Sequence, residues 1–253
     1  MKNILNKIYI HPSCYLIIII SLLAANFQKI IFVSLLLFIH ECGHFFTAMF
    51  FSWPTDKITF YPFGGISKFS HDINCPLKEE LIVLLMGPFT QIIFYHLLTK
   101  TLNVPIMIAS INYQILLFNL LPIYPLDGGR ILQCLSCYLF PYRLSFKVIY
   151  LISYFFLFLI IIFFLKFPSI NLIIIFLLLL YKLSKEKKLI TYSLEKFLLE
   201  RYLHNYHFKK GKITASEKKF QRDYYHIIKN HNWYYNENTY LKKKYENNAI
   251  IKK

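Results

Sequence analysis

Acidic residues and glycine are scarce in this chain, and their scarcity narrows the classes of protein that it can be. Its 253 residues include 13 Asp and Glu against 29 Lys and Arg, and only 7 Gly. Hydrophobic residues make up 56% of the chain and aromatic residues 19%. This composition excludes a single soluble domain and is typical of a membrane protein. The five cysteines are odd in number and stand in apolar surroundings, which argues against a disulfide framework.

Six apolar segments divide the first part of the chain, and each is close to the ~20 residues that a membrane-spanning helix needs. They are residues 12–27, 31–52, 81–99, 104–121, 146–165 and 169–183. We therefore expect an all-α membrane protein with about six transmembrane helices. In this interpretation residues 1–184 form the membrane-embedded domain, and residues 185–253 form a small, basic, cytoplasmic C-terminal region.

The distribution of charge indicates how the segments cross the membrane. The loops on one side hold one cation each, Lys29, Lys100 and Lys166, whereas the loops on the other side hold more. Since positively charged loops stay in the cytoplasm, both termini are predicted to be cytoplasmic. Residues 182–253 alone carry 18 Lys and Arg against 7 Asp and Glu, which accounts for +11 of the net +16.

This basic C-terminal region is open to three interpretations. It is a solvated surface, a surface for anionic lipid headgroups, or a site for an acidic partner. The sequence shows no recognised nucleic-acid-binding module, so nucleic acid is not an expected partner.

The pattern that most narrows the function is an H-E-x-x-H signature formed by His40, Glu41 and His44. Glu41 is the only fixed charge between residues 30 and 53. On a helix the two histidines project from one face, so they can hold one zinc ion while Glu41 acts as general base toward water. Histidines satisfied by hydrogen bonds are the alternative. Ionisable groups at membrane depth are costly, however, and a divalent cation would satisfy all three.

A second polar stretch supplies a third ligand. Asp127 is the only carboxylate between Glu80 and Glu186, and it follows a helix-breaking run with prolines at positions 122 and 125. The two glycines after it let the backbone turn closely beside a metal. Two histidines, one carboxylate and an open position for water describe a catalytic rather than a structural zinc site. The alternative role for Asp127 is a helix N-cap at the membrane surface.

The loop between the second and third apolar segments is a candidate for substrate binding. Residues 57–68 place β-branched and aromatic residues around Gly64 and Gly65, which predicts a short β-hairpin or a re-entrant loop at the cytoplasmic mouth of the site. The simplest interpretation is a connector. The functional interpretation is an exposed strand edge that pairs with an extended segment of the substrate.

Together these motifs resemble the site-2 protease family of intramembrane zinc metalloproteases. The second signature of that family is a short helix-breaking stretch that ends in Asp-Gly, which here runs from Tyr124 to Gly129. Three further stretches are similar to the stage IV sporulation protein FB subgroup. They are Tyr61–Gly65, Phe118–Pro122 and Phe197–Tyr202.

The resemblance implies one zinc ion per chain, a protein substrate and a set of site residues. His40, His44 and Asp127 would ligate zinc, Glu41 would activate water, and Asn119 and Pro125 would position the substrate. Members of the subgroup remove the pro-sequence of the sporulation sigma factor sigma-K, in the mother-cell membrane that surrounds the forespore. Two other membrane proteins hold them inactive, so a sigma-factor proprotein and inhibitory membrane proteins are the implied partners. The subgroup also carries a C-terminal nucleotide-sensing CBS domain, of which residues 220–226 resemble a remnant.

Two other functions could use the same residues. A membrane metal-ion transporter or channel could pass ions along His40, His44 and Asp127. Transporters often show inverted repeats and paired broken helices, whereas this sequence has one broken segment and no internal repeat. A catalytically inactive scaffold is opposed by the intact set of His, Glu and Asp. The sequence therefore favours an intramembrane zinc endopeptidase.

Overall fold

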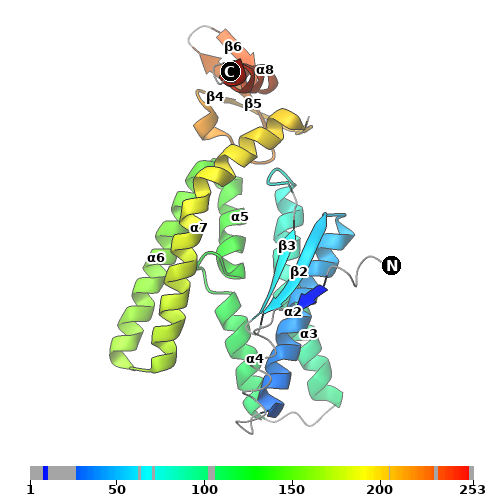
Figure 1. Cartoon of the computed structure of the whole chain (residues 1–253), viewed down its shortest axis with the longest axis vertical. Coiled ribbons are helices and arrows are strands. Elements are labelled where there is room, and N and C mark those ends of the chain that lie inside the picture. The colour runs from blue at the N-terminus through cyan, green and yellow to red at the C-terminus, as the bar shows by residue number, and fades with distance from the viewer. Residues whose placement is uncertain are drawn as a thin grey trace. The chain divides into compact units, whose positions relative to one another are not determined.

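The computed structural model describes residues 8–10, 27–61, 64–69, 72–101, 106–204, 206–230 and 233–250. The chain divides into two compact units. The first unit comprises residues 1–71 and 79–121, and the second comprises residues 72–78 and 122–253. Helices are the main elements of both units (Figure 1).

Three helices lie among the described residues of the first unit. α2 (Phe27–Phe50) carries the H-E-x-x-H motif, α3 (Leu77–Thr101) follows it, and α4 (Ile106–Asn119) ends where the helix-breaking stretch begins. Thr90 of α3 lies within hydrogen-bond distance of the Ile39 carbonyl of α2, at 3.3 Å. This close packing brings one face of α3 onto the turn of α2 that holds the two histidines.

A three-stranded sheet accompanies these helices. β1 (Ile8–Ile10) pairs in parallel with β2 (Thr55–Tyr61), and β2 pairs antiparallel with β3 (Gly64–Phe69). β3 lies along α2 (Figure 1). The register sets Tyr61 opposite Gly64 and Phe60 opposite Gly65, so the predicted β-hairpin is confirmed.

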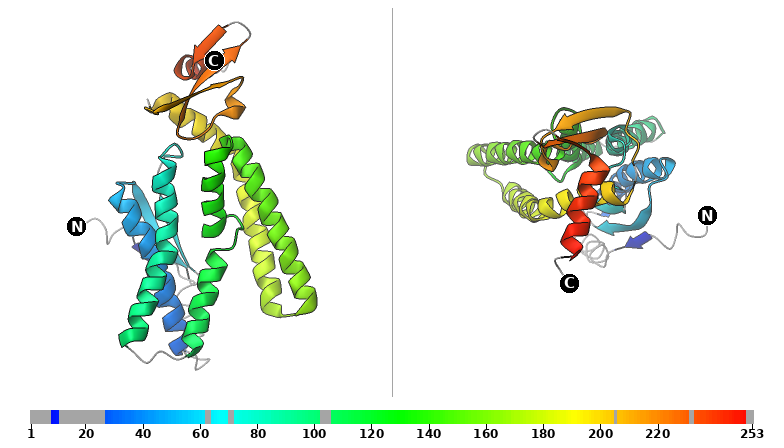
Figure 2. Two further views of the ribbon diagram at one scale, coloured as in Figure 1. Left: turned by 180° about the vertical axis from the view of Figure 1, so that it is seen from behind. Right: turned by 90° about the horizontal axis from the view of Figure 1, so that it is seen from above.

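The second unit contains three antiparallel helices, α5 (Asp127–Leu139), α6 (Tyr142–Lys166) and α7 (Ile170–Leu203). α6 packs against both of its neighbours (Figures 1 and 2). Its packing face follows a four-residue repeat, which keeps the side chains on one side of the helix. The residues of this face are Ser145, Ile149, Ser153 and Leu157, each at most 2% exposed. The opposite face is apolar and open, with Leu151 and Leu165 both 75% exposed, which suits contact with lipid rather than water.

Three helices among the described residues are long and apolar enough to cross a membrane, namely α2 over Ile30–Phe50, α3 and α6. Of the first expected span, residues 12–27, all but the last residue lie outside the described residues. α4 has 14 residues, or about 21 Å of helix, which is short of the ~30 Å hydrocarbon core. α7 has 34 residues and continues past residue 184 into the basic region without a break. The structure thus shows a mostly helical chain with three candidate spans and small sheets, and the count of six stays a prediction.

The basic C-terminal region contains a folded module with strands and a helix, shown in both views of Figure 2. β4 (Lys210–Thr214) pairs in parallel with β5 (Tyr224–Asn230), and β5 pairs antiparallel with β6 (Trp233–Asn236). A single 3-10 turn, η2 (Glu217–Lys219), lies between β4 and β5, and α8 (Glu237–Ile250) follows β6. We refer to residues 206–250 as the C-terminal module.

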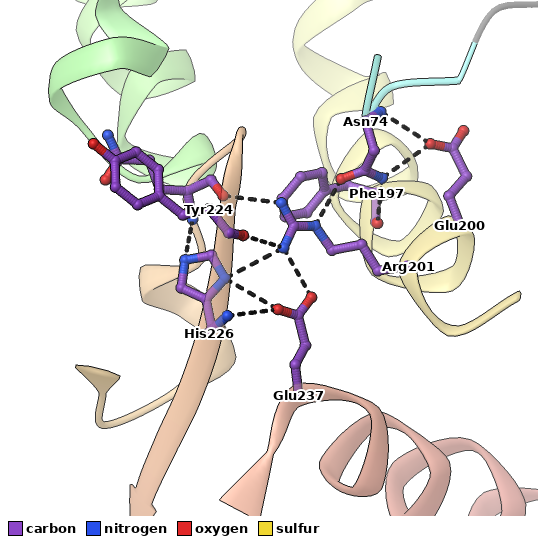
Figure 3. A network of polar contacts seen from close by, with 8 residues as sticks. Asn74, Phe197, Glu200, Arg201, Tyr224, His226 and Glu237 are labelled. Carbon is purple, nitrogen blue, oxygen red and sulfur yellow. Dashed lines mark hydrogen bonds and ion pairs between the residues drawn. The ribbon is translucent and has the colours of Figure 1, made fainter. Parts of the chain in front are cut away.

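A buried polar cluster connects this module to the end of α7 (Figure 3). Arg201 is 2% exposed and forms an ion pair with Glu237 of α8, with Nη1 and Oε1 2.8 Å apart. The same guanidinium donates to Asn74 Oδ1 at 2.6 Å and to the Gln221 carbonyl at 2.9 Å. Asn74 also donates to the Glu200 carboxylate at 3.1 Å. One network therefore joins the segment before α3, the last turn of α7 and the C-terminal module.

His226 of β5 completes the cluster as a neutral imidazole. The Gln221 N–H can only donate, so His226 Nε2 accepts it at 3.0 Å, and Nδ1 carries the hydrogen that faces Glu237 at 3.3 Å. Burial lowers the pKa of His226 below its ordinary value of 6.5, against the opposing hydrogen bond with Glu237. Burial alone would raise the pKa of Glu237, but His226 and the charge of Arg201 bring it below its ordinary value of 4.5. The cluster thus holds the Arg201–Glu237 ion pair, the Glu200 carboxylate and one uncharged imidazole ring.

We expect Glu237→Gln to destabilise the C-terminal module, because it leaves the buried Arg201 charge without its counter-ion. Breaking a buried pair from one side costs about 3–5 kcal/mol. Hydrogen exchange of residues 206–250 in the full-length protein should accelerate accordingly. Lys196→Met is the matched control, because the Lys196–Glu200 pair is 3.5 Å long with a lysine 39% exposed, and such exposed pairs contribute about 0.3–0.5 kcal/mol. Equal exchange in the two variants would contradict this account.

Candidate metal centre

α2 places both histidines of the H-E-x-x-H motif on one face, as their spacing predicts. His40 is 1% exposed and His44 is 7% exposed. Their Nε2 atoms lie 3.2 Å apart, and the rings meet edge-on with centroids 4.9 Å apart. Two nitrogen ligands of a tetrahedral zinc ion, each at about 2.0–2.1 Å, are separated by about 3.3 Å. The spacing of the two Nε2 atoms therefore suits a shared ion.

Hydrogen bonds at the other ring nitrogens decide what the Nε2 atoms can do. His44 Nδ1 donates to the Val83 carbonyl at 2.8 Å, and His40 Nδ1 donates to Gln91 Oε1 at 2.9 Å. In a neutral imidazole whose Nδ1 carries the hydrogen, Nε2 carries a lone pair. The Nε2–Nε2 contact is then no hydrogen bond, because neither atom has a hydrogen to donate. Two lone pairs that face each other at this distance can both bind one cation, so the pair fits a metal ion.

The carboxylate of Asp127 comes from the start of α5. Leu126 occupies the N-cap position without a side-chain hydrogen bond, and Asp127 is the first residue of the helix, so Asp127 does not stand at the N-cap position considered for it. A carboxylate in the first turn of a helix is stabilised by the N-terminal end of the helix dipole. This stabilises its ionised form, which is the form that binds metal.

A tight turn before α5 determines the position of Asp127. The Tyr124–Pro125 peptide is cis, and the Leu126 N–H donates to the Ile123 carbonyl at 2.9 Å. The first turn of α5 passes so close to this stretch that a side chain at Gly129 would overlap the backbone of Ile123 and Tyr124. The Tyr124 N–H donates to the Ser153 hydroxyl of α6 at 2.9 Å. Proline, glycine and α6 thus hold the turn together.

His40, His44 and Asp127 form a group that could hold a metal ion. Each offers one ligand atom, an imidazole nitrogen from each histidine and a carboxylate oxygen from Asp127. Two imidazoles and one carboxylate leave the fourth position of a tetrahedral ion open to water, which is the arrangement of a catalytic zinc site. The donor set and the convergent Nε2 atoms both fit zinc.

The other expected site residues take different places in the fold. Glu41 follows His40 in α2 and is half-buried. Asn119 is the last residue of α4, and Pro125 belongs to the cis peptide. Gly64 and Gly65 are the first residues of β3. The expected roles of the last four toward substrate stay predictions.

Sequence reasoning missed the support that α3 gives to the histidines. Val83, Gly87 and Gln91 are four residues apart, so they line one stripe of α3. Val83 supplies a carbonyl to His44, Gln91 supplies an amide oxygen to His40, and Gly87 leaves room for the His44 ring. The available signal was Gln91, a polar residue within an apolar span, together with one of only 7 glycines four positions before it.

Comparison with known proteins decides the family. The model of peptidase family M50 matches residues 28–104 and 97–163, more than half of the chain. The chain belongs to peptidase family M50. Both histidines, Glu41 and Asp127 of this M50 peptidase lie within the matched residues. The resemblance to the site-2 proteases is thereby confirmed.

Named relatives and a solved structure agree with this assignment. Stage IV sporulation protein FB of Bacillus subtilis is 33% identical over 148 residues, 56% of this chain and 51% of that protein. A zinc metalloprotease of Methanocaldococcus jannaschii is 26% identical over 157 residues, 56% of this chain and 45% of that protein. The structure of the site-2 protease from the same archaeon superposes with a TM-score of 0.54 and 26% identity, covering 71% of this chain and 89% of that one.

The chain spans about half the length of the curated relatives it matches. The family is one of peptidases, the named relatives include zinc metalloproteases, and the similar solved structure is that of a site-2 protease. A protein is the substrate class that a peptidase family implies.

We expect Gly87→Ala to displace the His44 ring, because a methyl group at this position would overlap the imidazole. Loss of a well-placed ligand should weaken zinc binding about 10-fold or more, which zinc titration of the purified, metal-free protein would measure. Gly211→Ala is the control, since no atom lies within 4 Å of the position that its methyl group would take. A Gly87→Ala protein with wild-type zinc affinity would show that His44 is not a ligand in this geometry.

Proposed function

We propose that this M50 peptidase is an intramembrane zinc endopeptidase that hydrolyses a peptide bond of a membrane-associated protein near the cytoplasmic face. The observation that carries the proposal is the convergence of the His40 and His44 Nε2 lone pairs at 3.2 Å. The Asp127 carboxylate, the third member of the candidate group, supports it. These three residues would hold one zinc ion.

Zinc and Glu41 would have separate roles in the hydrolysis. Zinc, when bound, polarises the scissile carbonyl and makes water a stronger acid. Glu41, next to a ligand and half-buried, accepts the proton of the attacking water. The water oxygen bonds to the carbonyl carbon, the C–N bond breaks, and Glu41 returns the proton to the departing amine.

The topology that we propose has six spans and cytoplasmic termini, with residues 1–184 in the membrane and residues 185–253 in the cytoplasm. The cation counts of alternate loops support it. Three candidate spans among the described residues and the open apolar face of α6 are compatible with it. The spanning helices are then surrounded by the lipid bilayer, and a site near the cytoplasmic face has access to water.

The substrate that we propose is the pro-sequence of the sporulation sigma factor sigma-K. The 33% identity to stage IV sporulation protein FB supports a sporulation role. By the same likeness the enzyme would act in the mother-cell membrane around the forespore, under the control of inhibitory membrane proteins.

We further propose that the substrate binds as an extended strand along the β2–β3 hairpin. A peptide bond in a helix is shielded by its own hydrogen bonds, so the cut segment must unwind before water can attack it. A sheet edge at Gly64 and Gly65 would satisfy the freed backbone groups. The Asn119 amide at the end of α4 would form a hydrogen bond with another freed backbone group of the substrate. Pro125 would shape the adjoining turn.

Glu41→Gln should abolish cleavage and retain zinc, because the amide cannot take a proton from water but leaves the three ligands in place. Asp127→Ala should lose both zinc and cleavage. Zinc content by elemental analysis and conversion of co-expressed sigma-factor proprotein to a shorter product would separate the two variants. Near-normal cleavage by Glu41→Gln would rule out its role as base.

Gly65→Val and Asn119→Ala should reduce cleavage without changing zinc content, because both act on the substrate backbone. The loss should be larger for a substrate with strong helix formers at the cut site, since unwinding that segment costs more. Cleavage rates of a matched pair of substrates, helical and helix-broken, provide the measurement. Equal losses on the two substrates would contradict strand pairing.

A further inference from the structure

A chain of three buried polar side chains runs from the metal centre into the neighbouring helices. His40 of α2 is 1% exposed, Gln91 of α3 is 0% exposed and Asn112 of α4 is 2% exposed. Amides in apolar helices are costly to bury unless their hydrogen bonds are satisfied. The zinc chemistry proposed above assigns no role to either amide.

The contacts of Gln91 with α4 determine which groups in this chain of side chains donate and which accept. Gln91 Nε2 donates to the backbone carbonyl of Asn112 at 3.3 Å and to Asn112 Oδ1 at 3.0 Å. A backbone carbonyl can only accept, so the NH₂ group of Gln91 must face Asn112. Turning the Gln91 amide over would place its oxygen against two acceptor oxygens. The Gln91 oxygen is thereby directed at His40.

This orientation determines which nitrogen of His40 carries the hydrogen. Gln91 Oε1 accepts from His40 Nδ1 at 2.9 Å, so the lone pair of the neutral ring is on Nε2. His40 Nε2 faces His44 Nε2 at 3.2 Å. We infer that Gln91, oriented by Asn112, is a positioning residue that holds His40 in the tautomer and ring orientation required for metal binding. This inference rests on the proposed zinc site.

The two histidines differ in a way that makes the inference testable. The Val83 carbonyl accepts a hydrogen bond from His44 Nδ1 in the same way. This carbonyl belongs to the backbone, so no side-chain substitution removes it. His40 depends on a side chain, so its support can be deleted while its neighbour stays intact. Loss of an outer hydrogen bond to a metal-binding histidine typically weakens metal affinity by about 10–100-fold.

A purely structural role for Gln91 makes a different prediction. In that case the amide only joins α2, α3 and α4, and its loss lowers thermal stability without a selective loss of metal affinity. Leu84→Ala provides the comparison, because Leu84 belongs to the same helix, is 2% exposed and has no polar group. It should lower the thermal midpoint of the metal-free protein and leave the zinc affinity of the folded protein unchanged.

The experiment measures two quantities on the full-length, detergent-solubilised protein, the zinc dissociation constant by competition with a chromophoric chelator and the thermal midpoint without metal. Gln91→Met, which keeps the side-chain length and removes the acceptor, should weaken zinc binding by about 10–100-fold. Asn112→Leu should weaken it less, since the backbone carbonyl still orients Gln91, and Asn112→Asp should restore it because a carboxylate oxygen accepts from Gln91 as well. If Gln91→Met does not fold, the comparison of Asn112→Leu with Asn112→Asp still tests the inference.

Each outcome has one meaning. Wild-type zinc affinity in folded Gln91→Met overturns the inference, as does an equal loss of affinity in Leu84→Ala. If Gln91→Met does not fold, equal affinities in Asn112→Leu and Asn112→Asp overturn it. Failure of the wild-type chain to bind about one zinc ion would instead overturn the proposed function, so the two failures are distinguishable.

Discussion

A polar group that leaves water must find a partner, and the rest of this structure depends on that constraint. The two histidines of the metal centre lie in a helix that is otherwise almost entirely apolar, and both are at most 7% exposed. Each uses Nδ1 to donate to an acceptor on α3. The two Nε2 atoms face each other at 3.2 Å, a separation that suits a shared metal ion. The requirement that makes the helices pack around these rings is therefore the same one that creates the metal site.

The register of α3 against α2 is the geometric parameter on which this arrangement depends. Val83, Gly87 and Gln91 supply a carbonyl, an empty space and an amide oxygen from one stripe of α3. A rotation of α3 by one residue, about 100°, would remove all three from the histidines together. Because three positions of this stripe contact the two histidines, the packing of α3 against α2 has little freedom to change.

The sequence predicts the parts of the site that depend on local pattern. The spacing of His40 and His44, the isolation of Asp127 among carboxylates and the hairpin around Gly64 and Gly65 could all be read before any contact was known. The support from Gln91 could not, because it depends on which face of α3 meets α2. The continuation of α7 past residue 184 was also missed. Hydropathy measures how apolar a segment is, whereas where a helix ends is decided by turns and by packing.

Two buried polar clusters in this chain show how a structural cluster differs from a functional one. Around Arg201, the guanidinium donates to acceptors of the protein, namely Glu237, Asn74 and the Gln221 carbonyl. The charge of Arg201 is thus neutralised by a carboxylate of the chain itself. At the histidines the hydrogen bonds to α3 complete one side of each ring and leave lone pairs converging on the other. Burial alone therefore does not mark a site. What marks it is a pair of buried imidazoles whose Nε2 atoms face each other at 3.2 Å, because this spacing suits two ligands of one metal ion.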